Sequence, residues 1–371
     1  MKHFSNIFAK TVGTALLVAG AAACDYIHDD SLEPCEYRLH FVYDYNMKFA
    51  DAFQHEVSKV SLFLCDDKGN FLMQRQIEGD ELKANNVKLD LEPGTYYALT
   101  WAGLDEGSYE WPALTPGSST IQDIKVRTLR NADATQLNEL EPLWHALDTL
   151  VITGTAHEDK EISLAKNTNK LRFVLQDTEG YSMNVDDFTF EITADNGYMD
   201  YDNTVLDDPQ ITYLPYYTES IDIASGSESD EAIGKPLSQM VAVAEMNTMR
   251  LMAGENYRLV VRHKDWADDV LNINLPNYLL LTQMEGHNMS AQEYLDRQDE
   301  YSIIFFLTPI LCPDCPDEPD EPDEPDEPDE PDNPDNPDEP DEPDPPHPIV
   351  GYACYKIQVK DWVIRLNNGE L

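Results

Sequence analysis

Positive charge is scarce in this sequence. Its 371 residues carry 25 Lys and Arg against 71 Asp and Glu, a formal net charge of −46. Nucleic-acid binding needs a Lys/Arg surface that neutralises phosphates, so the composition excludes nucleic acid as a partner. It also excludes adhesion to anionic lipid by charge. Part of the acidity is local, because 18 of the acidic residues lie between Asp314 and Asp344, where there is no Lys or Arg.

Enzyme motifs are also missing. There is no His-Glu-x-x-His, no phosphate-binding loop and no Gly-x-Ser-x-Gly, and the nine histidines are scattered. We therefore expect no catalytic residues, no cofactor and no bound metal; a hydrolase assembled from distant residues is the alternative. Asp195-Asn196-Gly197 with Asp200 and Asp202 suggests calcium, but the spacing fails the pattern of a helix-flanked calcium loop, so we predict a polar hairpin turn.

Long apolar runs are absent after the N-terminal segment. No apolar run in the rest of the chain reaches the roughly 18 residues that a membrane-spanning helix needs. The N-terminus itself has two lysines, a short apolar run and three small residues before Cys24, which is typical of a secretory signal peptide. A cysteine in that position predicts cleavage by a lipoprotein signal peptidase. Residues 1–23 would be removed, and Cys24 would carry diacylglyceride and palmitate chains that hold the protein on a bilayer. An ordinary secretory signal is the alternative, since Ala21 stands where Leu or Val is usual.

The mature chain is expected to contain two domains, because 348 residues (371 minus 23) exceed one compact core. After a tether over 24–35, alternating apolar segments run through 36–155 and restart through 156–311, which predicts an all-β protein of two tandem sandwiches. Ser290 followed by Glu293 predicts one short helix with a capping box. The expected strands are Tyr37–Tyr43, Val57–Cys65, Phe71–Ile77, Val87–Leu91, Tyr96–Leu104, Ile121–Val126, Leu147–Gly154, Glu161–Ala165, Lys170–Leu175, Phe188–Ala194, Ile211–Tyr217, Met240–Met249, Tyr257–Arg262, Val270–Leu275 and Tyr301–Leu307.

A Pro-Asp-Glu repeat dominates residues 312–348. Proline at every third position and like charges predict an extended, disordered linker, with weak binding of divalent cations as the alternative. Residues 349–371 then hold one or two strands, too few to fold alone. They are expected to join the sheet of their own second domain, or else to complete the open edge of another protein.

The cysteines of the linker region have an unusual context. A redox pair at Cys312 and Cys315 needs a helix start, which the neighbouring prolines oppose, and zinc needs a second pair. We therefore expect a disulfide from Cys312 or Cys315 to Cys354, which would close the linker into a loop. If Cys24 is acylated, five cysteines remain, so at least one is free or pairs between molecules.

Several segments recur together in one known family. They are Tyr43–Met47, Leu91–Tyr96 followed by Thr100–Gly103, Glu293–Gln298, Pro34-Cys35 and Asp361–Val363. With the lipoprotein cysteine, their order resembles the FimB/Mfa-type fimbrial anchor lipoproteins of Bacteroidales along nearly the whole mature chain. The resemblance implies two transthyretin-like β-sandwiches, held by lipid on the outer membrane and exposed at the cell surface. It also implies binding of the first fimbrial stalk subunit by strand exchange. Only Cys24 carries over as a functional residue.

Two other functions compete with the anchor. A surface glycan-binding lipoprotein would use Trp111, Trp144 and Trp266 as a stacking platform for sugar rings, although core packing explains such residues more often. A fimbrial tip adhesin is the other alternative. A lipid at the N-terminus argues against it, because the tip lies far from the membrane.

Overall fold

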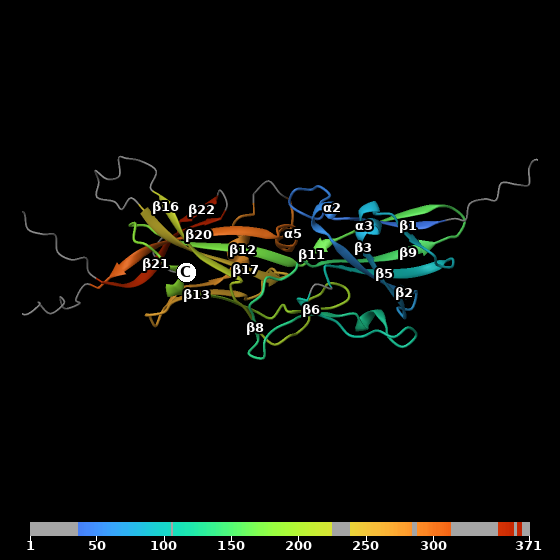
Figure 1. Cartoon of the computed structure of the whole chain (residues 1–371), viewed down its shortest axis with the longest axis horizontal. Helices are drawn as coiled ribbons and strands as arrows, with labels where there is room; N and C mark the ends of the chain where they lie inside the picture. Colours follow the sequence, from blue (N-terminus) through green and yellow to red (C-terminus); the bar gives the residue numbers. More distant parts are fainter. Residues whose placement is uncertain are drawn as a thin grey trace, which may run out of the picture.

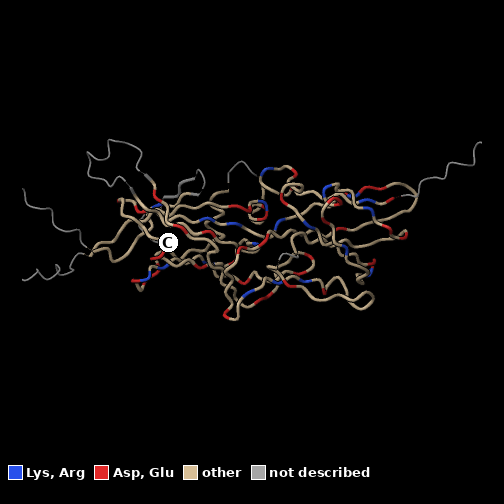
Figure 2. Tube along the Cα trace, in the orientation of Figure 1, with Lys and Arg blue, Asp and Glu red and all other residues tan. Residues whose placement is uncertain are grey.

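The structure is a computed structural model that describes residues 36–104, 107–224, 238–283, 288–312, 348–359 and 362–365. The predicted signal peptide, the tether and nearly all of the acidic linker lie outside these ranges. The described residues form two β-sandwiches placed end to end along the long axis (Figure 1). The predicted all-β fold of two sandwiches is therefore confirmed. Figure 2 shows acidic positions spread along both sandwiches, with basic ones interspersed.

The first sandwich occupies the right half of Figure 1. Its elements are β1 (Tyr37–Val42), α2 (Phe53–Glu56), β2 (Lys59–Asp66), β3 (Phe71–Glu78), α3 (Gly79–Ala84), β4 (Val87–Leu89), β5 (Gly94–Ala102), β9 (Trp144–Ile152), β10 (Glu158–Ser163) and β11 (Ala165–Lys166). A three-stranded sheet, β10-β1-β4, faces a five-stranded sheet, β11-β9-β5-β2-β3. In β1 the burial alternates along the strand, as a sheet with one face on a core requires.

The five-stranded sheet is covered on both faces. Along β2 the side chains of Leu62 and Leu64 enter one core, and those of Phe63 and Cys65 enter another. Strands buried on two faces have continuous apolar runs instead of an alternation. The continuous apolar run of β2 therefore fits a strand, and the run is unbroken because both faces of the sheet are buried.

The second face is covered by the excursion between β5 and β9. It contains β6 (Tyr109–Glu110), a 3-10 turn η1 (Ile121–Asp123), β7 (Val126–Thr128) and β8 (Thr135–Gln136). The sequence predicts a strand over Ile121–Val126, but Thr120 and Asp123 form a reciprocal capping box that starts the 3-10 turn instead. β7 pairs with β14 (Tyr198–Met199), so the excursion is joined to the second half of the chain.

The second sandwich packs a six-stranded sheet, β16-β17-β12-β20-β21-β22, against a five-stranded one, β19-β18-β13-β15-β8. Its elements are β12 (Thr168–Asp177), η2 (Val185–Asp187), β13 (Phe188–Ala194), β15 (Ile211–Tyr213), β16 (Tyr217–Ala224), β17 (Ser238–Met249), β18 (Arg258–His263), β19 (Asp269–Asn274), α4 (Leu275–Leu280), α5 (Ala291–Arg297), β20 (Glu300–Leu311), β21 (Ile349–Val359) and β22 (Trp362–Arg365). The predicted strand Ile211–Tyr217 is split between the two sheets. Pro215 lies between β15 and β16. Because proline has no backbone N–H to donate to a strand ladder, it favours the break between the two strands.

The change from the first sandwich to the second lies later than the expected boundary at residues 155 and 156. β10 pairs in parallel with β1, and β11 pairs with β9, so both strands belong to the first sandwich. Ile162 and Leu164 have no exposed surface and complete the first core. The chain therefore crosses near Asn167, where β12 begins.

The C-terminal segment pairs within its own chain. β21 lies antiparallel to β20, from Ile303 opposite Val359 to Leu311 opposite Ile349. Ile357 is fully buried in the second core. The structure therefore has the intramolecular docking that the sequence favours for this segment.

Candidate functional site

The junction between the sandwiches is built from a loop that follows β1. Within this loop, the Asn46 amide donates to the carbonyls of Tyr43 and Ala50, each at 2.8 Å. A carboxylate oxygen of Asp51 accepts the backbone N–H groups of Tyr43 and Phe53, each at 2.9 Å. The loop is therefore held by its own side chains, and it keeps a fixed shape next to the second sandwich.

The loop contacts α5 through one arginine. The Met47 N–H donates to the Arg297 carbonyl at 3.1 Å, and the Arg297 guanidinium lies 4.0 Å from the ring centre of Tyr45. As predicted, Ser290 caps α5, because its hydroxyl accepts the Glu293 N–H at 3.1 Å. Two segments on which the family resemblance rests, Tyr43–Met47 and Glu293–Gln298, thus touch each other across the junction.

A buried ion triad joins the sandwiches next to that loop. The Lys166 ammonium of β11 lies 2.6 Å from Asp299 and 3.0 Å from Glu56, and its side chain is 11% exposed. Burial opposes the charge on Lys166, but the two carboxylates outweigh it and raise the pKa of the ammonium. The ammonium also lies 5.2 Å from the ring centre of Trp144. One cation therefore binds groups from both sandwiches.

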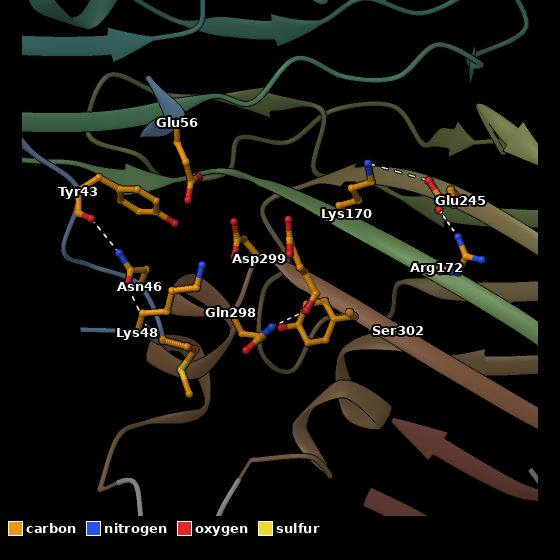
Figure 3. Close-up of a pocket in the computed structure, with 13 residues that line it drawn as sticks. Tyr43, Asn46, Lys48, Glu56, Lys170, Arg172, Glu245, Gln298, Asp299 and Ser302 are labelled. Atoms are coloured by element: carbon orange, nitrogen blue, oxygen red, sulfur yellow. Dashed lines mark hydrogen bonds and ion pairs between the residues drawn. The ribbon is translucent and has the colours of Figure 1, made fainter. Parts of the chain in front are cut away.

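A groove of about 470 Å³ opens beside the triad (Figure 3). On its β12 side, Arg172 lies 2.5 Å from Glu245, and Lys170 is 3.9 Å from the same carboxylate. The residues that line the groove include no histidine and no cysteine. These ion pairs join neighbouring strands of the second sandwich, β12 and β17, and Lys166 links the two sandwiches beside them.

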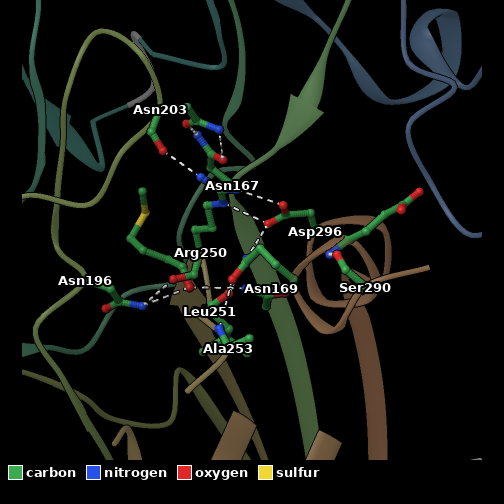
Figure 4. A network of polar contacts seen from close by, with 12 residues as sticks. Asn167, Asn169, Asn196, Asn203, Arg250, Leu251, Ala253, Ser290 and Asp296 are labelled. Atoms are coloured by element: carbon green, nitrogen blue, oxygen red, sulfur yellow. Dashed lines mark hydrogen bonds and ion pairs between the residues drawn. The ribbon is translucent and has the colours of Figure 1, made fainter. Parts of the chain in front are cut away.

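A polar network lies behind the junction (Figure 4). Arg250 donates to both carboxylate oxygens of Asp296, at 2.7 and 2.8 Å, and to the Asn203 carbonyl at 2.6 Å. Asn196 has no exposed surface; its amide donates to the carbonyls of Met249 and Arg250 at 3.1 and 3.0 Å. The network fixes the end of β17 to α5 and to the turn after β14.

The turn that suggested calcium is part of this network. Asn196 is committed to backbone carbonyls, and Asp202 accepts from the N–H and hydroxyl of Thr204 at 3.1 and 2.8 Å. Within the described part of the chain, no group of three or more His, Cys, Asp or Glu side chains is placed to hold a metal ion. These polar residues therefore serve the local structure.

The three tryptophans proposed as a glycan platform lie apart. Trp144 is 2% exposed and packs edge-on against Tyr43, so core packing explains it and it is not available to stack on a sugar. Trp111 lines a hollow of about 320 Å³ beside Arg127. Trp266 lines another of about 460 Å³ at the end of the second sandwich.

The cysteines differ from expectation in one respect. Cys354 carries a free thiol, so the predicted disulfide to Cys354 is not formed. Cys354 lies on the core side of β21, where burial raises the pKa of its thiol to about 12. Cys312 is disulfide-bonded. Cys24 and Cys315 lie outside the described residues, so acylation of Cys24 stays a prediction.

His145 of β9 is a buried titratable group next to the junction. It is 5% exposed, and its Nε2 donates to the Tyr201 carbonyl at 2.8 Å. Burial lowers the pKa of His145 from 6.5 to about 4. Between these values the unfolded chain binds more protons than the folded one, so stability should fall by up to about 3 kcal/mol as pH drops through this window.

A His145→Gln variant tests this pH dependence, because glutamine retains an N–H donor and does not titrate. Unfolding in urea at pH 7 and pH 4.5 should show a smaller loss of stability for the variant than for the wild type. If the wild type and His145→Gln lost the same stability between pH 7 and pH 4.5, protonation of His145 would not destabilise the fold.

The fold and the junction define a class: a two-domain all-β protein built from tandem sandwiches. The chain belongs to the family of fimbrillin-A associated anchor proteins Mfa1 and Mfa2, which it matches over residues 32–368. This confirms the predicted family. It is a family of structural proteins associated with fimbriae, not of enzymes, and membership implies association with the cell surface. No helix among the described residues has the length and apolar character needed to cross a bilayer.

Solved structures agree with this assignment. A Bacteroides thetaiotaomicron protein described as a candidate polysaccharide-binding protein is 32% identical, with a TM-score of 0.69, covering 90% of this chain and 99% of that one. A candidate adhesin from the same organism is 29% identical, with a TM-score of 0.68 and coverages of 91% and 100%. The fimbrial anchor protein Mfa2 of Porphyromonas gingivalis shares the fold at 16% identity, with a TM-score of 0.58 and coverages of 90% and 99%. A search of curated proteins found no match.

Proposed function

We propose that this chain is an outer-membrane lipoprotein that holds the base of a fimbrium by binding its first stalk subunit. The observation that carries the proposal is the match to the anchor family, which begins at residue 32, shortly after Cys24. Lipid on Cys24 would attach the chain to the membrane, and the sandwiches would meet the fimbrium.

The direction of the strands supports this division of roles. β1 starts at Tyr37 and ends next to the junction, since the loop that follows it contacts Arg297. β20 starts at the junction and continues for 12 residues away from it, about 40 Å at strand spacing. β1 and the far ends of β20 and β21 therefore lie at opposite ends of the molecule (Figure 1). With lipid at the N-terminus, the second sandwich points away from the membrane.

Binding by strand exchange needs an unpaired strand edge. β16 and β19 are each the last strand of their sheet in the second sandwich. Such strands present backbone N–H and C=O groups to an incoming strand. In the proposed assembly, a strand of the stalk subunit pairs with one of these edges.

Replacing Cys24 with Ala tests the anchor. The variant should not incorporate an alkyne-labelled fatty acid, should leave the outer-membrane fraction, and should release fimbriae into the medium. Ser31→Ala, in the same tether, is the matched control and should behave like the wild type. Fimbriae that stay on cells carrying Cys24→Ala would rule out the lipid as their attachment.

A glycan-binding lipoprotein is the second candidate, favoured by the 32% identical protein that is described as a candidate for polysaccharide binding. Trp111 and Trp266 each line a hollow. A polysaccharide pull-down that captures the wild type and not the Trp111→Ala or Trp266→Ala variant would support it over the anchor.

A further inference from the structure

We propose that the stalk subunit docks at the hollow on the far end of the second sandwich, through a segment that carries Lys or Arg beside an apolar side chain. The inference rests on the proposed anchoring function. We call this site the distal hollow; its volume is about 460 Å³, and the residues that matter to the argument are Asp265, Trp266, Asp268, Ile310, Val350 and Tyr352.

The distal hollow lies at the end where a fimbrium would be met. It is bounded by the last residues of β20, the first residues of β21 and the loop between β18 and β19. These strand ends lie at the left of Figure 1, whereas β1 lies at the right. A protein held by lipid before β1 presents this end farthest from the membrane.

The aromatic wall of the hollow is rigid. Trp266 stacks on His263 with ring centres 3.9 Å apart and planes at 19°, and Tyr352 meets Trp266 edge-on at 5.2 Å. The buried Phe188 lies beside both rings, with its ring centre 5.1 Å from that of His263 and 6.4 Å from that of Tyr352. Because these rings fix one another, a partner that binds there orders few side chains and loses little conformational entropy.

Apolar side chains are exposed around the same hollow. Ile310 is 48% exposed, Val350 45% and the adjacent Leu311 38%. Gly351 stands opposite Ile310 in the β20–β21 ladder, and a Cβ there would lie 3.4 Å from the Ile310 side chain. The missing side chain leaves the hollow open. Neighbouring exposed branched side chains at one end of a strongly acidic protein indicate an interaction surface.

The charge of the rim selects the partner. The Asp265 side chain is 67% exposed and lies 3.9 Å from His263; Asp268 is also exposed. The nearby Lys264 is already paired with Asp187 at 2.5 Å. Among the described residues, neither Asp265 nor Asp268 forms an ion pair with Lys or Arg, whereas Asp269 is paired with Arg262. The carboxylates of Asp265 and Asp268 therefore favour an incoming Lys or Arg.

A sugar fits the hollow less well than a peptide. Stacking a sugar needs an open aromatic face, but His263 covers one face of Trp266 and Tyr352 packs against the same ring. The exposed aliphatic side chains of Ile310 and Val350 match apolar side chains better than hydroxyl groups.

The test uses the full-length lipoprotein in detergent, immobilised on beads, and fimbriae sheared from a strain of the same bacterium that lacks this anchor. Asp265→Lys with Asp268→Lys reverses two exposed charges and leaves the core unchanged. Trp266→Ala removes the aromatic wall. Each variant should reduce captured fimbriae at least tenfold. The matched control, Asp67→Lys with Asp90→Lys, reverses two exposed charges on the first sandwich and should capture as much as the wild type.

The outcomes separate the two proposals. If the wild type captures fimbriae and both distal variants capture equally well, docking lies elsewhere and the distal hollow is excluded, while the anchoring function stands. If the wild type captures none, the anchoring function fails. If the distal variants keep fimbriae but lose binding to a yeast mannan probe, the hollow is a sugar site and this inference is wrong.

Discussion

Replacing Asp296 with Ala should lower the free energy of unfolding by about 3–5 kcal/mol, because it leaves Arg250 as a buried cation without its carboxylate. The pair is bidentate, and the side chains are 17% and 10% exposed. Solvent therefore screens the pair little and can replace little of the lost interaction. Urea unfolding followed by tryptophan fluorescence measures the loss as a lower midpoint.

An ion pair with more access to solvent gives the matched control. Lys160 lies 2.7 Å from Asp148, but the two side chains are 34% and 30% exposed. Asp148→Ala should cost at most about 1 kcal/mol, as exposed pairs do. A double change, Arg250→Met with Asp296→Leu, should recover much of the loss, since it leaves no unpaired charge. If Asp296→Ala cost no more than Asp148→Ala, the network in Figure 4 would have no special role in stability.

The same short helix serves both the network and the junction. α5 carries Asp296, which holds Arg250, and Arg297, which stacks on Tyr45 of the first sandwich. Lys166 adds a second link through Asp299, just after the helix. α5 and the residues that follow it therefore link the two sandwiches through side chains, in addition to the backbone pairing of β7 with β14.

Strands with a clear alternation could be predicted from the sequence. Tyr37, Leu39 and Phe41 alternate with less buried residues, and β1 forms there because the first core covers one face. The pattern failed where a local hydrogen-bonded cap starts a turn. Ile121–Val126 is apolar enough for a strand, but the capping box of Thr120 and Asp123 forms a turn. The helices α2 and α3 have only 4 and 6 residues, too few for a helical period to be recognised.

The sites were less predictable, because their residues are distant in sequence. Asp296 and Arg250 lie 46 positions apart, and no local pattern links them. Cys354 was assigned by the spacing of cysteines, whereas its place on the core face of β21 decides its state. The sequence did mark the two segments that meet at the junction, because Tyr43–Met47 and Glu293–Gln298 are both part of the family resemblance. Their contact, however, is visible only in the fold.

Replacing Ile357 with Asp should destabilise the second sandwich by at least about 3 kcal/mol, because it places a carboxyl group in the core without a partner. Ile357 is fully buried opposite Phe305, in the ladder between β21 and β20. The cost should appear first as release of β21, since among the described residues the segment of β21 and β22 pairs with the rest of the fold through β20 alone. Hydrogen exchange over residues 349–359 measures that release.

Tyr355→Asp is the matched control, because Tyr355 lies on the same strand and is 54% exposed. It should change stability by less than about 1 kcal/mol and leave exchange over 349–359 slow. If Ile357→Asp and Tyr355→Asp gave the same fast exchange as the wild type, β21 would not be docked on its own sheet in solution. It would then be available to complete the open edge of another protein, and the mechanism of attachment would shift from the distal hollow to this strand.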